Sequence, residues 1–242
     1  MIVLGIETAT AVCGTALVRD GVVLAEAALE MPRIHAERLM PLADEACRKA
    51  GIGPRELDGV AVSIGPGSFT GLRIGLSAAK GLAFATGAAL VAVPTLQALV
   101  RRVRADEGTL ILAVLDAGRE DVYAQFFLRT PEGDAETTPA RALPVEEVLR
   151  EAGELLKTAG DRPAVVTGDG REKIRRSAAG IPLRFAADDE SRCGADAVAL
   201  LGEEMLRGGR VADPAGLEPH YIRDFLFTRA HTCPGSSVPR KR

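Results

Sequence analysis

The sequence has 242 residues, which allows one long domain or two small lobes, and its hydrophobic fraction of 47% can supply a sizeable aliphatic core. The net charge of −3, with mixed signs along the chain, disfavours a protein that holds nucleic acid mainly by neutralising phosphates. The four cysteines show neither C-x-x-C nor zinc-finger spacing, so we expect reduced thiols in a cytoplasmic protein. Neither an export signal nor an apolar stretch of membrane-spanning length is visible, so no membrane association is expected.

The first hundred residues predict three strands followed by alternating helices and strands. Apolar runs at 2–6, 13–18 and 22–28 are separated by polar turns, of which Asp20-Gly21 is typical of a tight hairpin. Helical spacing follows from 33 to 50. Pro41 is expected to kink that helix because proline lacks the backbone N–H that would donate a helical hydrogen bond. The remaining predicted elements are a strand at 60–64, a helix at 69–86, a strand at 90–93 and a helix to 103. This order favours a ribonuclease-H-like lobe, a mixed sheet between helices, over a doubly wound sheet.

The second half of the chain opens in the same way as the first. The charged segment 104–108 is a plausible crossing between lobes, which gives an N-terminal lobe at 1–105 and a smaller C-terminal lobe at 106–223. A strand at 109–115, a polar turn and a returning strand at 121–128 form a weak internal duplication. We expect a surface excursion at 130–140, a helix at 145–156, a strand at 164–167 and a helix at 195–207. Residues 224–242 lose periodicity and are expected to form a disordered tail.

The run from Gly65 to Gly75 joins a predicted strand to a predicted helix. Exposed amides and the helix dipole at such a junction can hold an anion. The run lacks the Gly-Lys-Ser/Thr of a P-loop, and Thr70 stands where a dinucleotide-binding fingerprint needs its third glycine. An anion-binding corner and a well-capped helix start therefore both stay open.

The helix that follows is rich in small residues, and glycine within a helix costs about 1 kcal/mol relative to alanine. Close approach by another element would compensate for that cost, and the element could be the chain's own sheet or a helix of a partner. If it is a partner, Gly75→Leu should block the complex and leave the lobe folded; an unfolded lobe would indicate the sheet. The small residues are Gly71, Gly75, Ser77, Ala78, Ala79, Gly81, Ala83 and Ala85.

Two acidic residues, Glu7 and Asp116, end the first strands of the two halves. If they face each other across a cleft, they could position hydrated Mg²⁺ beside nucleotide phosphates; alternatively, each caps its own turn. His35 has no second histidine in reach, so neither H-x-x-x-H nor H-E-x-x-H is present. A serine or cysteine hydrolase would lack a nucleophile elbow. We therefore predict neither catalytic residues nor a metal site of the histidine type.

Six motifs together are similar to one known family. In chain order they are Ile6-Glu7-Thr8-Ala9-Thr10, His35 with Arg38, Leu39 and Pro41, the run from Gly65 to Gly75, Val93-Pro94-Thr95-Leu96, Leu115-Asp116-Ala117-Gly118-Arg119 with Val122-Tyr123, and Glu218-Pro219-His220-Tyr221-Ile222-Arg223. They resemble the bacterial tRNA threonylcarbamoyladenosine biosynthesis family TsaB, also called YeaZ. The run from Gly65 to Gly75 is the most specific of them.

The resemblance implies an actin-like (ASKHA) α/β fold of two ribonuclease-H-like lobes, each with a mixed sheet and flanking helices. It also implies a role in attaching threonylcarbamoyl to N6 of adenosine 37 in tRNAs that read codons beginning with A. The related subunit TsaD performs the transfer and carries a metal-binding histidine pair, whereas this chain has only His35 in the corresponding helix. The expected role is therefore a non-catalytic scaffold that pairs with TsaD. The ATPase TsaE is the expected third component, and tRNA is expected to bind through the complex. When the chain is alone, it could also form a homodimer.

The resemblance also assigns expected site residues on the first lobe. Glu7 stands where the family commonly has Asp, which weakens the expectation of an ATP and Mg²⁺ site in this subunit.

An independent actin-like ATPase or kinase is the alternative function. A metalloprotease is disfavoured because the histidine pair is missing. The expected nucleotide contacts are Glu7, Thr8, Thr10, Gly65, Gly67, Ser68 and Asp116. The expected partner contacts are His35, Arg38, Leu39, Leu42, Phe69, Leu72, Arg73, Gly75, Leu76 and Ala79.

Overall fold

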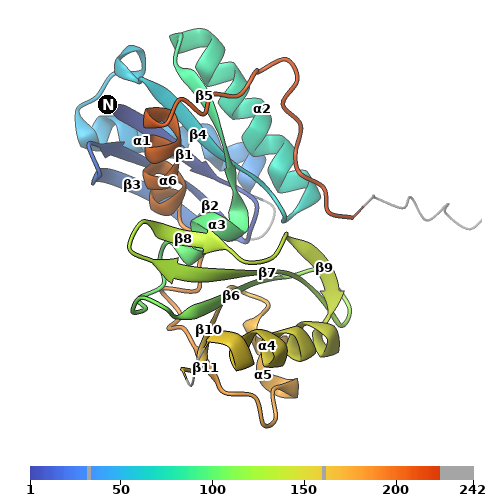
Figure 1. Ribbon diagram of the computed structural model, residues 1–242. Coiled ribbons are helices and arrows are strands. Elements are labelled where there is room, and N and C mark those ends of the chain that lie inside the picture. Colours follow the sequence, from blue (N-terminus) through green and yellow to red (C-terminus); the bar gives the residue numbers. More distant parts are fainter. Residues whose placement is uncertain (32–33, 160–161, 224–242) are drawn as a thin grey trace, which may run out of the picture.

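The computed structural model describes residues 1–31, 34–159 and 162–223, and it contains two sheets in two lobes (Figure 1). The first sheet has the order β3-β2-β1-β4-β5. Its strands are β1 (Ile2–Glu7), β2 (Val12–Arg19), β3 (Val22–Glu30), β4 (Gly59–Gly65) and β5 (Ala89–Pro94). Strand β1 pairs antiparallel with β2 and parallel with β4, so the predicted mixed sheet is confirmed.

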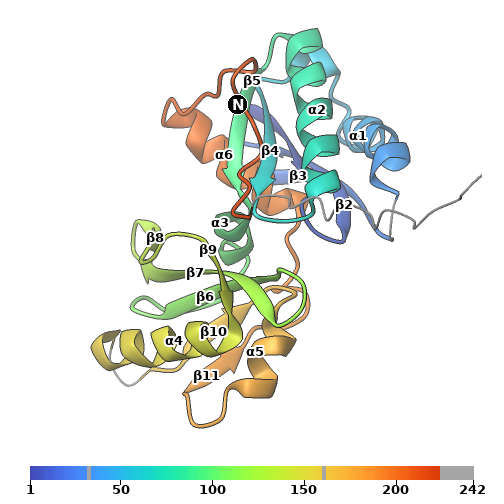
Figure 2. The same ribbon diagram turned by 90° about the vertical axis from the view of Figure 1, so that its right-hand side faces the viewer.

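Helices cover both faces of the first sheet because side chains of a strand alternate between its faces. On β1, Leu4 and Ile6 pack against α1 (His35–Ala50) and α2 (Phe69–Thr86), next to the short 3₁₀ helix η1 (Pro54–Glu56). Val3 points the other way, towards α3 (Thr95–Val100) and α6 (Ala195–Arg207). Figure 2 shows α1 and α2 on one side of the sheet and α6 on the other.

The second sheet has the order β11-β10-β6-β7-β8, and β9 also pairs with β7. Its outer face is covered by two helices, whose apolar residues pack on β6, β7 and β10. The elements are β6 (Leu110–Asp116), β7 (Asp121–Thr130), β8 (Gly133–Glu136), β9 (Arg141–Pro144), α4 (Val145–Ala159), β10 (Ala164–Thr167), α5 (Arg171–Ser177) and β11 (Leu183–Phe185). This sheet is also mixed, since β6 is antiparallel to β7 and parallel to β10.

The expected surface excursion at 130–140 is wrong in part, because it contains strand β8. Thr130 pairs with Gly133, so a tight hairpin returns the chain along β7. Strand β8 is polar and half exposed, and backbone hydrogen bonds to β7 rather than apolar burial hold it in place. The sequence therefore lacks the apolar alternation that identifies a strand.

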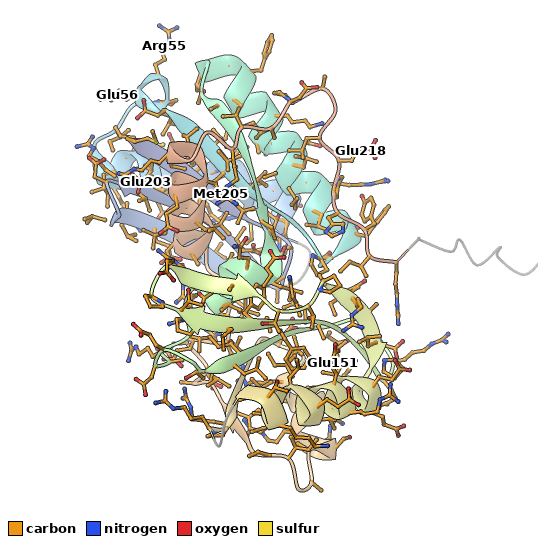
Figure 3. All side chains as sticks on the ribbon, in the orientation of Figure 1. Arg55, Glu56, Glu151, Glu203, Met205 and Glu218 are labelled. Atoms are coloured by element: carbon orange, nitrogen blue, oxygen red, sulfur yellow. The ribbon has the colours of Figure 1, made fainter. Side chains whose placement is uncertain are left out.

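The C-terminal part of the predicted second lobe belongs to the first lobe. Ala195 and Ala199 of α6 pack on Ala16 and Val18 of β2. Glu203 of α6 (Figure 3) accepts hydrogen bonds from the backbone amides of Asp20 and Gly21, at 2.8 and 2.7 Å, in the β2–β3 turn. The structure thus differs from the predicted division into 1–105 and 106–223, because periodicity identifies an amphipathic helix without showing which sheet it covers.

Residues 208–223 continue from α6 as an extended strap over the first lobe (Figure 1). The amide of Ala212 donates to the carbonyl of Leu90 at 2.8 Å, and the amide of His220 donates to that of Ile64 at 2.7 Å. The strap therefore runs along the β4–β5 side of the first sheet. The predicted tail at 224–242 lies outside the described residues.

One buried apolar cluster spans both lobes. Leu96 and Leu99 of α3 belong to the same buried cluster as Val3 of β1 and as Ile111 and Phe127 of the second sheet. Apolar side chains from both lobes therefore pack against one another where the lobes meet. Cys13, Cys47 and Cys193 are buried free thiols. Across the described ranges, none of the helices has the length and apolarity that crossing a membrane requires.

Candidate functional site

Glu7 ends β1 with its carboxylate fully buried at the junction of the lobes. Its Oε1 accepts hydrogen bonds from the amide and hydroxyl of Thr10, at 3.0 and 3.1 Å, and its Oε2 accepts one from the thiol of Cys193 at 3.4 Å. Burial raises the pKa of Glu7 to about 7, although hydrogen bonds from Ser63, Cys193 and Thr10 act in the opposite direction. Both oxygens are therefore occupied within the chain.

Asp116 ends β6 and has a half-exposed side chain. It forms an ion pair with Lys173 at 2.7 Å and accepts a hydrogen bond from the amide of Gly118 at 2.6 Å. Partial burial works against ionisation, but the contacts with Lys173 and Gly118 prevail and lower the pKa of Asp116. Its own amide donates to Asp169 at 2.8 Å. Asp116 thus caps its turn, as one of the two sequence alternatives expects.

A small pocket lies near these two strand ends. It measures about 40 Å³ and is lined in part by Thr10, Leu115, Asp169 and Cys193. Pockets for small molecules usually measure about 300–1,000 Å³. Of the residues expected to contact ATP and Mg²⁺, Thr10 lines this pocket, which is smaller than that range. Among the residues that the structure describes, no group of three or more His, Cys, Asp or Glu is placed to hold a metal ion.

Several amides of the Gly65–Gly75 run bond within the chain instead of facing an anion. The amide of Gly65 donates to the hydroxyl of Thr95 at 3.1 Å, and that of Ser68 donates to the carbonyl of Ala9 at 2.7 Å. The hydroxyl of Ser68 accepts from the amide of Gly71 at 3.2 Å, which caps α2. These contacts favour a capped helix start over an anion-binding corner.

The glycines at the start of α2 allow it to approach β1 and the turn after it. A β-carbon on Gly71 would lie 2.0 Å from the carbonyl oxygen of Thr8, and one on Gly75 would lie 2.1 Å from Thr8 Oγ1. By contrast, a β-carbon on Gly81 would meet no atom within 4 Å. The chain's own sheet therefore explains Gly71 and Gly75, whereas Gly81 lies on the exposed face of α2.

The expected partner contacts divide into two groups. The side chains of Arg38 and Arg73 are exposed, whereas His35 is partly buried with Nε2 at 3.3 Å from the carbonyl of Val12. Five apolar residues instead lie inside the first lobe, where they pack on the sheet or its helices, and their side chains are not available to a partner. These buried residues are Leu39, Leu42, Leu72, Leu76 and Ala79.

Phe69 and Arg73 meet the strap beside the N-terminal end of α2. The rings of Phe69 and Tyr221 have centroids 5.0 Å apart, and the Arg73 guanidinium lies 4.0 Å from the Phe69 centroid. Arg73 Nε also donates to the hydroxyl of Tyr221 at 2.9 Å. Figure 3 shows Glu218 on this strap beside α2. Sequence reasoning identified 218–223 as a motif but gave no indication that it packs here.

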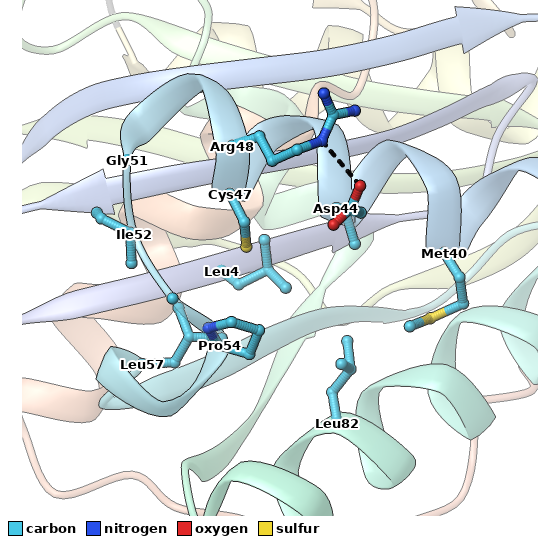
Figure 4. Close-up of a pocket in the computed structure, with 12 residues that line it drawn as sticks. Leu4, Met40, Asp44, Cys47, Arg48, Gly51, Ile52, Pro54, Leu57 and Leu82 are labelled. Atoms are coloured by element: carbon cyan, nitrogen blue, oxygen red, sulfur yellow. Dashed lines mark hydrogen bonds and ion pairs between the residues drawn. The ribbon is translucent and has the colours of Figure 1, made fainter.

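The outward face of α1 and α2 carries exposed apolar side chains that sequence reasoning missed. Met40 of α1 is 47% exposed and Phe84 of α2 is 93% exposed. An apolar groove of about 480 Å³ lies between α1, η1 and α2 (Figure 4). Met40 and Leu82 line it, and the ion pair of Asp44 with Arg48, at 2.9 Å, lies at α1 beside it. We call the exposed side of α2 the outer helical face, defined by Ser77, Gly81, Phe84 and Ala85. Leu82 points instead to the groove, because residues two apart lie on opposite sides of a helix.

Comparisons with known proteins agree on one family. A sequence model described as TsaD, tRNA N6-adenosine threonylcarbamoyltransferase, matches residues 22–181. The tRNA threonylcarbamoyladenosine biosynthesis protein TsaB of Escherichia coli is 33% identical over 169 residues, covering 69% of this chain and 72% of that protein. TsaB of Bacillus subtilis is 29% identical over 228 residues, covering 92% and 94%.

Solved structures agree on the fold. A protein from Pseudomonas aeruginosa described as similar to peptidase YEAZ has a TM-score of 0.78 at 27% identity, covering 92% of this chain and 99% of that one. The ethanolamine utilization protein EutJ of Carboxydothermus hydrogenoformans has a TM-score of 0.50 at 14% identity, covering 83% and 89%. The predicted ASKHA fold of two ribonuclease-H-like lobes is confirmed.

Proposed function

Because the chain belongs to the TsaB/YeaZ family of tRNA threonylcarbamoyladenosine biosynthesis proteins, we propose that it is the non-catalytic subunit that binds and activates TsaD. Participation in this tRNA modification follows from the family itself. In the proposed division of work, TsaD transfers threonylcarbamoyl to N6 of adenosine 37, and this chain provides a folded surface for TsaD. TsaE joins as the ATPase, and tRNA binds to the assembled complex.

The outer helical face is the observation that carries the proposal. Phe84 exposes an aromatic ring almost completely, and exposed aromatic residues are enriched among the anchors of protein interfaces. Small residues at 77, 81 and 85 are spaced by four along the exposed side of α2, so a partner helix could approach the backbone closely. Met40 and the apolar groove form a second exposed apolar area, between α1 and α2. The outer helical face therefore combines an aromatic anchor with a track of small residues.

The junction of the lobes supports a non-catalytic role. Both oxygens of Glu7 accept hydrogen bonds within the chain, and the adjoining pocket measures about 40 Å³. An independent actin-like ATPase or kinase, the alternative function, needs that junction to admit a nucleotide. The internal hydrogen bonds of Glu7 therefore favour the non-catalytic role over this alternative.

Size-exclusion chromatography of the purified chain mixed with TsaD tests the proposal. We expect a single peak of higher apparent mass that contains both proteins. ATP turnover by the chain alone is measured in parallel and is expected to match the buffer control. Absence of a complex, together with rapid ATP turnover by the isolated chain, would contradict the scaffold function and favour the alternative.

A further inference from the structure

A pocket of about 840 Å³ at the junction of the lobes is lined largely by arginine. We propose that it binds phosphates of the RNA backbone, an inference that rests on the proposed function in tRNA modification. Asp106 is the single acidic residue among those that line it. The arginines come from the crossing after α3, from β7, from the segment before β10 and from β11. They are Arg101, Arg102, Arg104, Arg129, Arg162 and Arg184.

Three of these arginines hold the junction together. Arg101 pairs with Glu204 of α6, and Arg102 pairs with Asp196 of the same helix. Arg129 pairs with Asp134. It also donates to the carbonyls of residues 100 and 103, at 3.4 and 3.0 Å, at the end of α3. Carboxylates offset the charge of these three guanidinium groups, and we assign them a structural role.

Two of the other three, Arg162 and Arg184, leave positive charge at the surface of the pocket. Arg162 donates to the carbonyl of Glu107 at 2.7 Å, and Arg184 donates to the carbonyl of Arg104 at 2.9 Å. A backbone carbonyl orients a guanidinium group without neutralising it. Arg104 has an 88% exposed side chain and forms an ion pair with Glu190 at 3.5 Å, so its charge is partly offset. Each guanidinium carries five N–H donors, so these contacts leave donors for a ligand.

The chemistry of this surface matches phosphodiesters. The planar fork of arginine binds two phosphate oxygens at once, and the charge persists at every physiological pH. The residues that line the pocket include no aromatic side chain on which a base could stack. Contacts to phosphate position a nucleic acid without reading its sequence, which suits a subunit that does not itself choose the modified base. The net charge of −3 does not oppose this, because the positive charge is local.

The test compares two double variants in the complex with TsaD. Arg162→Gln with Arg184→Gln removes two charges from the pocket. Arg150→Gln with Arg210→Gln removes two exposed charges elsewhere, on α4 and after α6, and serves as the matched control. Fluorescence anisotropy measures the affinity for unmodified tRNA between 50 and 200 mM salt. Size-exclusion chromatography first establishes that each variant still binds TsaD.

We expect the pocket variant to bind tRNA more weakly and with less salt dependence. Each lost phosphate contact reduces the slope of log affinity against log salt by about 0.7 to 0.9, so two reduce it by about 1.4 to 1.8. Over this salt range, the ratio of the wild-type affinity for tRNA to that of the pocket variant therefore falls by about 7-fold to 12-fold. The control should keep the slope of the wild type. Equal affinities and equal slopes for the wild type and the pocket variant would overturn the inference.

Two additional titrations, one with the free chain and one with ATP, complete the test. If the wild type forms no complex with TsaD, the proposed function fails, and tRNA titration of the free chain still tests the pocket. Lack of tRNA binding by that free chain then overturns the inference as well. Titration with ATP tests a nucleotide as the source of phosphate. If the pocket substitutions weaken ATP binding but leave tRNA affinity unchanged, the occupant is a nucleotide and the RNA proposal is wrong.

Discussion

Gly75 faces Thr8 so closely that a β-carbon on residue 75 would lie 2.1 Å from Thr8 Oγ1. We therefore expect Gly75→Ala to destabilise the protein by about 1–3 kcal/mol, since enlarging a residue in a packed core forces its neighbours to shift. Gly81→Ala is the matched control on the same helix and should stabilise by about 1 kcal/mol. Urea denaturation measures both changes. Equal effects of the two substitutions would show that α2 does not pack on β1 as described.

The same contact changes the expectation for Gly75→Leu. The sequence left a partner helix and the chain's own sheet as alternatives, and the partner alternative predicted a folded lobe unable to form the complex. Because Thr8 occupies the space, the larger side chain should instead unfold the first lobe. Circular dichroism of the variant distinguishes the two outcomes. A native spectrum with complex formation lost would support the partner alternative.

The buried carboxyl of Glu7 predicts a pH-dependent stability. Its pKa is about 7 in the folded state and 4.5 when unperturbed, so between these values the folded state binds more protons than the unfolded state. The stabilisation of the folded state by the protonated carboxyl is fully present below about pH 4.5. It is lost as the pH rises through 7. The total loss is about 3 kcal/mol, taking 1.36 kcal/mol for each pKa unit.

Glu7→Gln provides the test of this pH dependence, because glutamine keeps the shape and stays neutral. Urea denaturation at pH 5 and pH 8 should show a smaller loss of stability in the variant than in the wild type. Parallel losses in the two proteins would mean that Glu7 titrates near its ordinary value and is less buried than described.

The contact between the strap and α2 predicts a graded effect at Tyr221. Tyr221→Phe removes the hydrogen bond from Arg73 and should cost about 0.5–1.5 kcal/mol. Tyr221→Ala also removes the ring that meets Phe69 and should cost more. Limited proteolysis should then cut residues 210–223 faster in the Ala variant than in the Phe variant. Cleavage at the rate of the wild type in both would show that Tyr221 does not hold the strap.

Exposure of Phe84 predicts that its replacement weakens binding to TsaD without loss of stability. Lysine is a good helix former and is favourable near the C-terminal end of α2, so Phe84→Lys should leave the thermal midpoint unchanged. A central interface aromatic contributes about 2 kcal/mol or more, so we expect affinity for TsaD to fall at least about 30-fold. Val22→Lys, at an exposed apolar position on β3, is the control. Calorimetry that gave the same affinity for both variants would place the interface elsewhere.

Much of the fold was predictable because its signals are local. The helix predicted at 69–86 matches α2, since Ser68 and Gly87 mark its ends in the sequence. The hairpin at Asp20-Gly21 and the mixed first sheet also follow from turn residues and apolar runs. Strand β8 and the sheet that α6 covers were not predictable, because backbone pairing and long-range packing decide them.

The candidate surfaces were less predictable than the fold. A motif does not show which way a side chain points, so the predicted partner set includes Leu39 and Leu72, which are buried. Phe84 lies in no motif, and only its exposure identifies it. The arginine pocket gathers Arg104, Arg162 and Arg184 from distant parts of the chain, and no sequence spacing relates them.

Threonylcarbamoyl transfer to unmodified tRNA by TsaD, measured with and without this chain, shows whether the chain is a non-catalytic activator. We predict no product from the chain alone, a rise in TsaD product with the wild type, and the same rise with Glu7→Gln. Phe84→Lys should fail to raise it. Loss of activation by Glu7→Gln, in a variant that still folds and binds TsaD, would contradict the claim and assign the interlobe junction a part in the reaction.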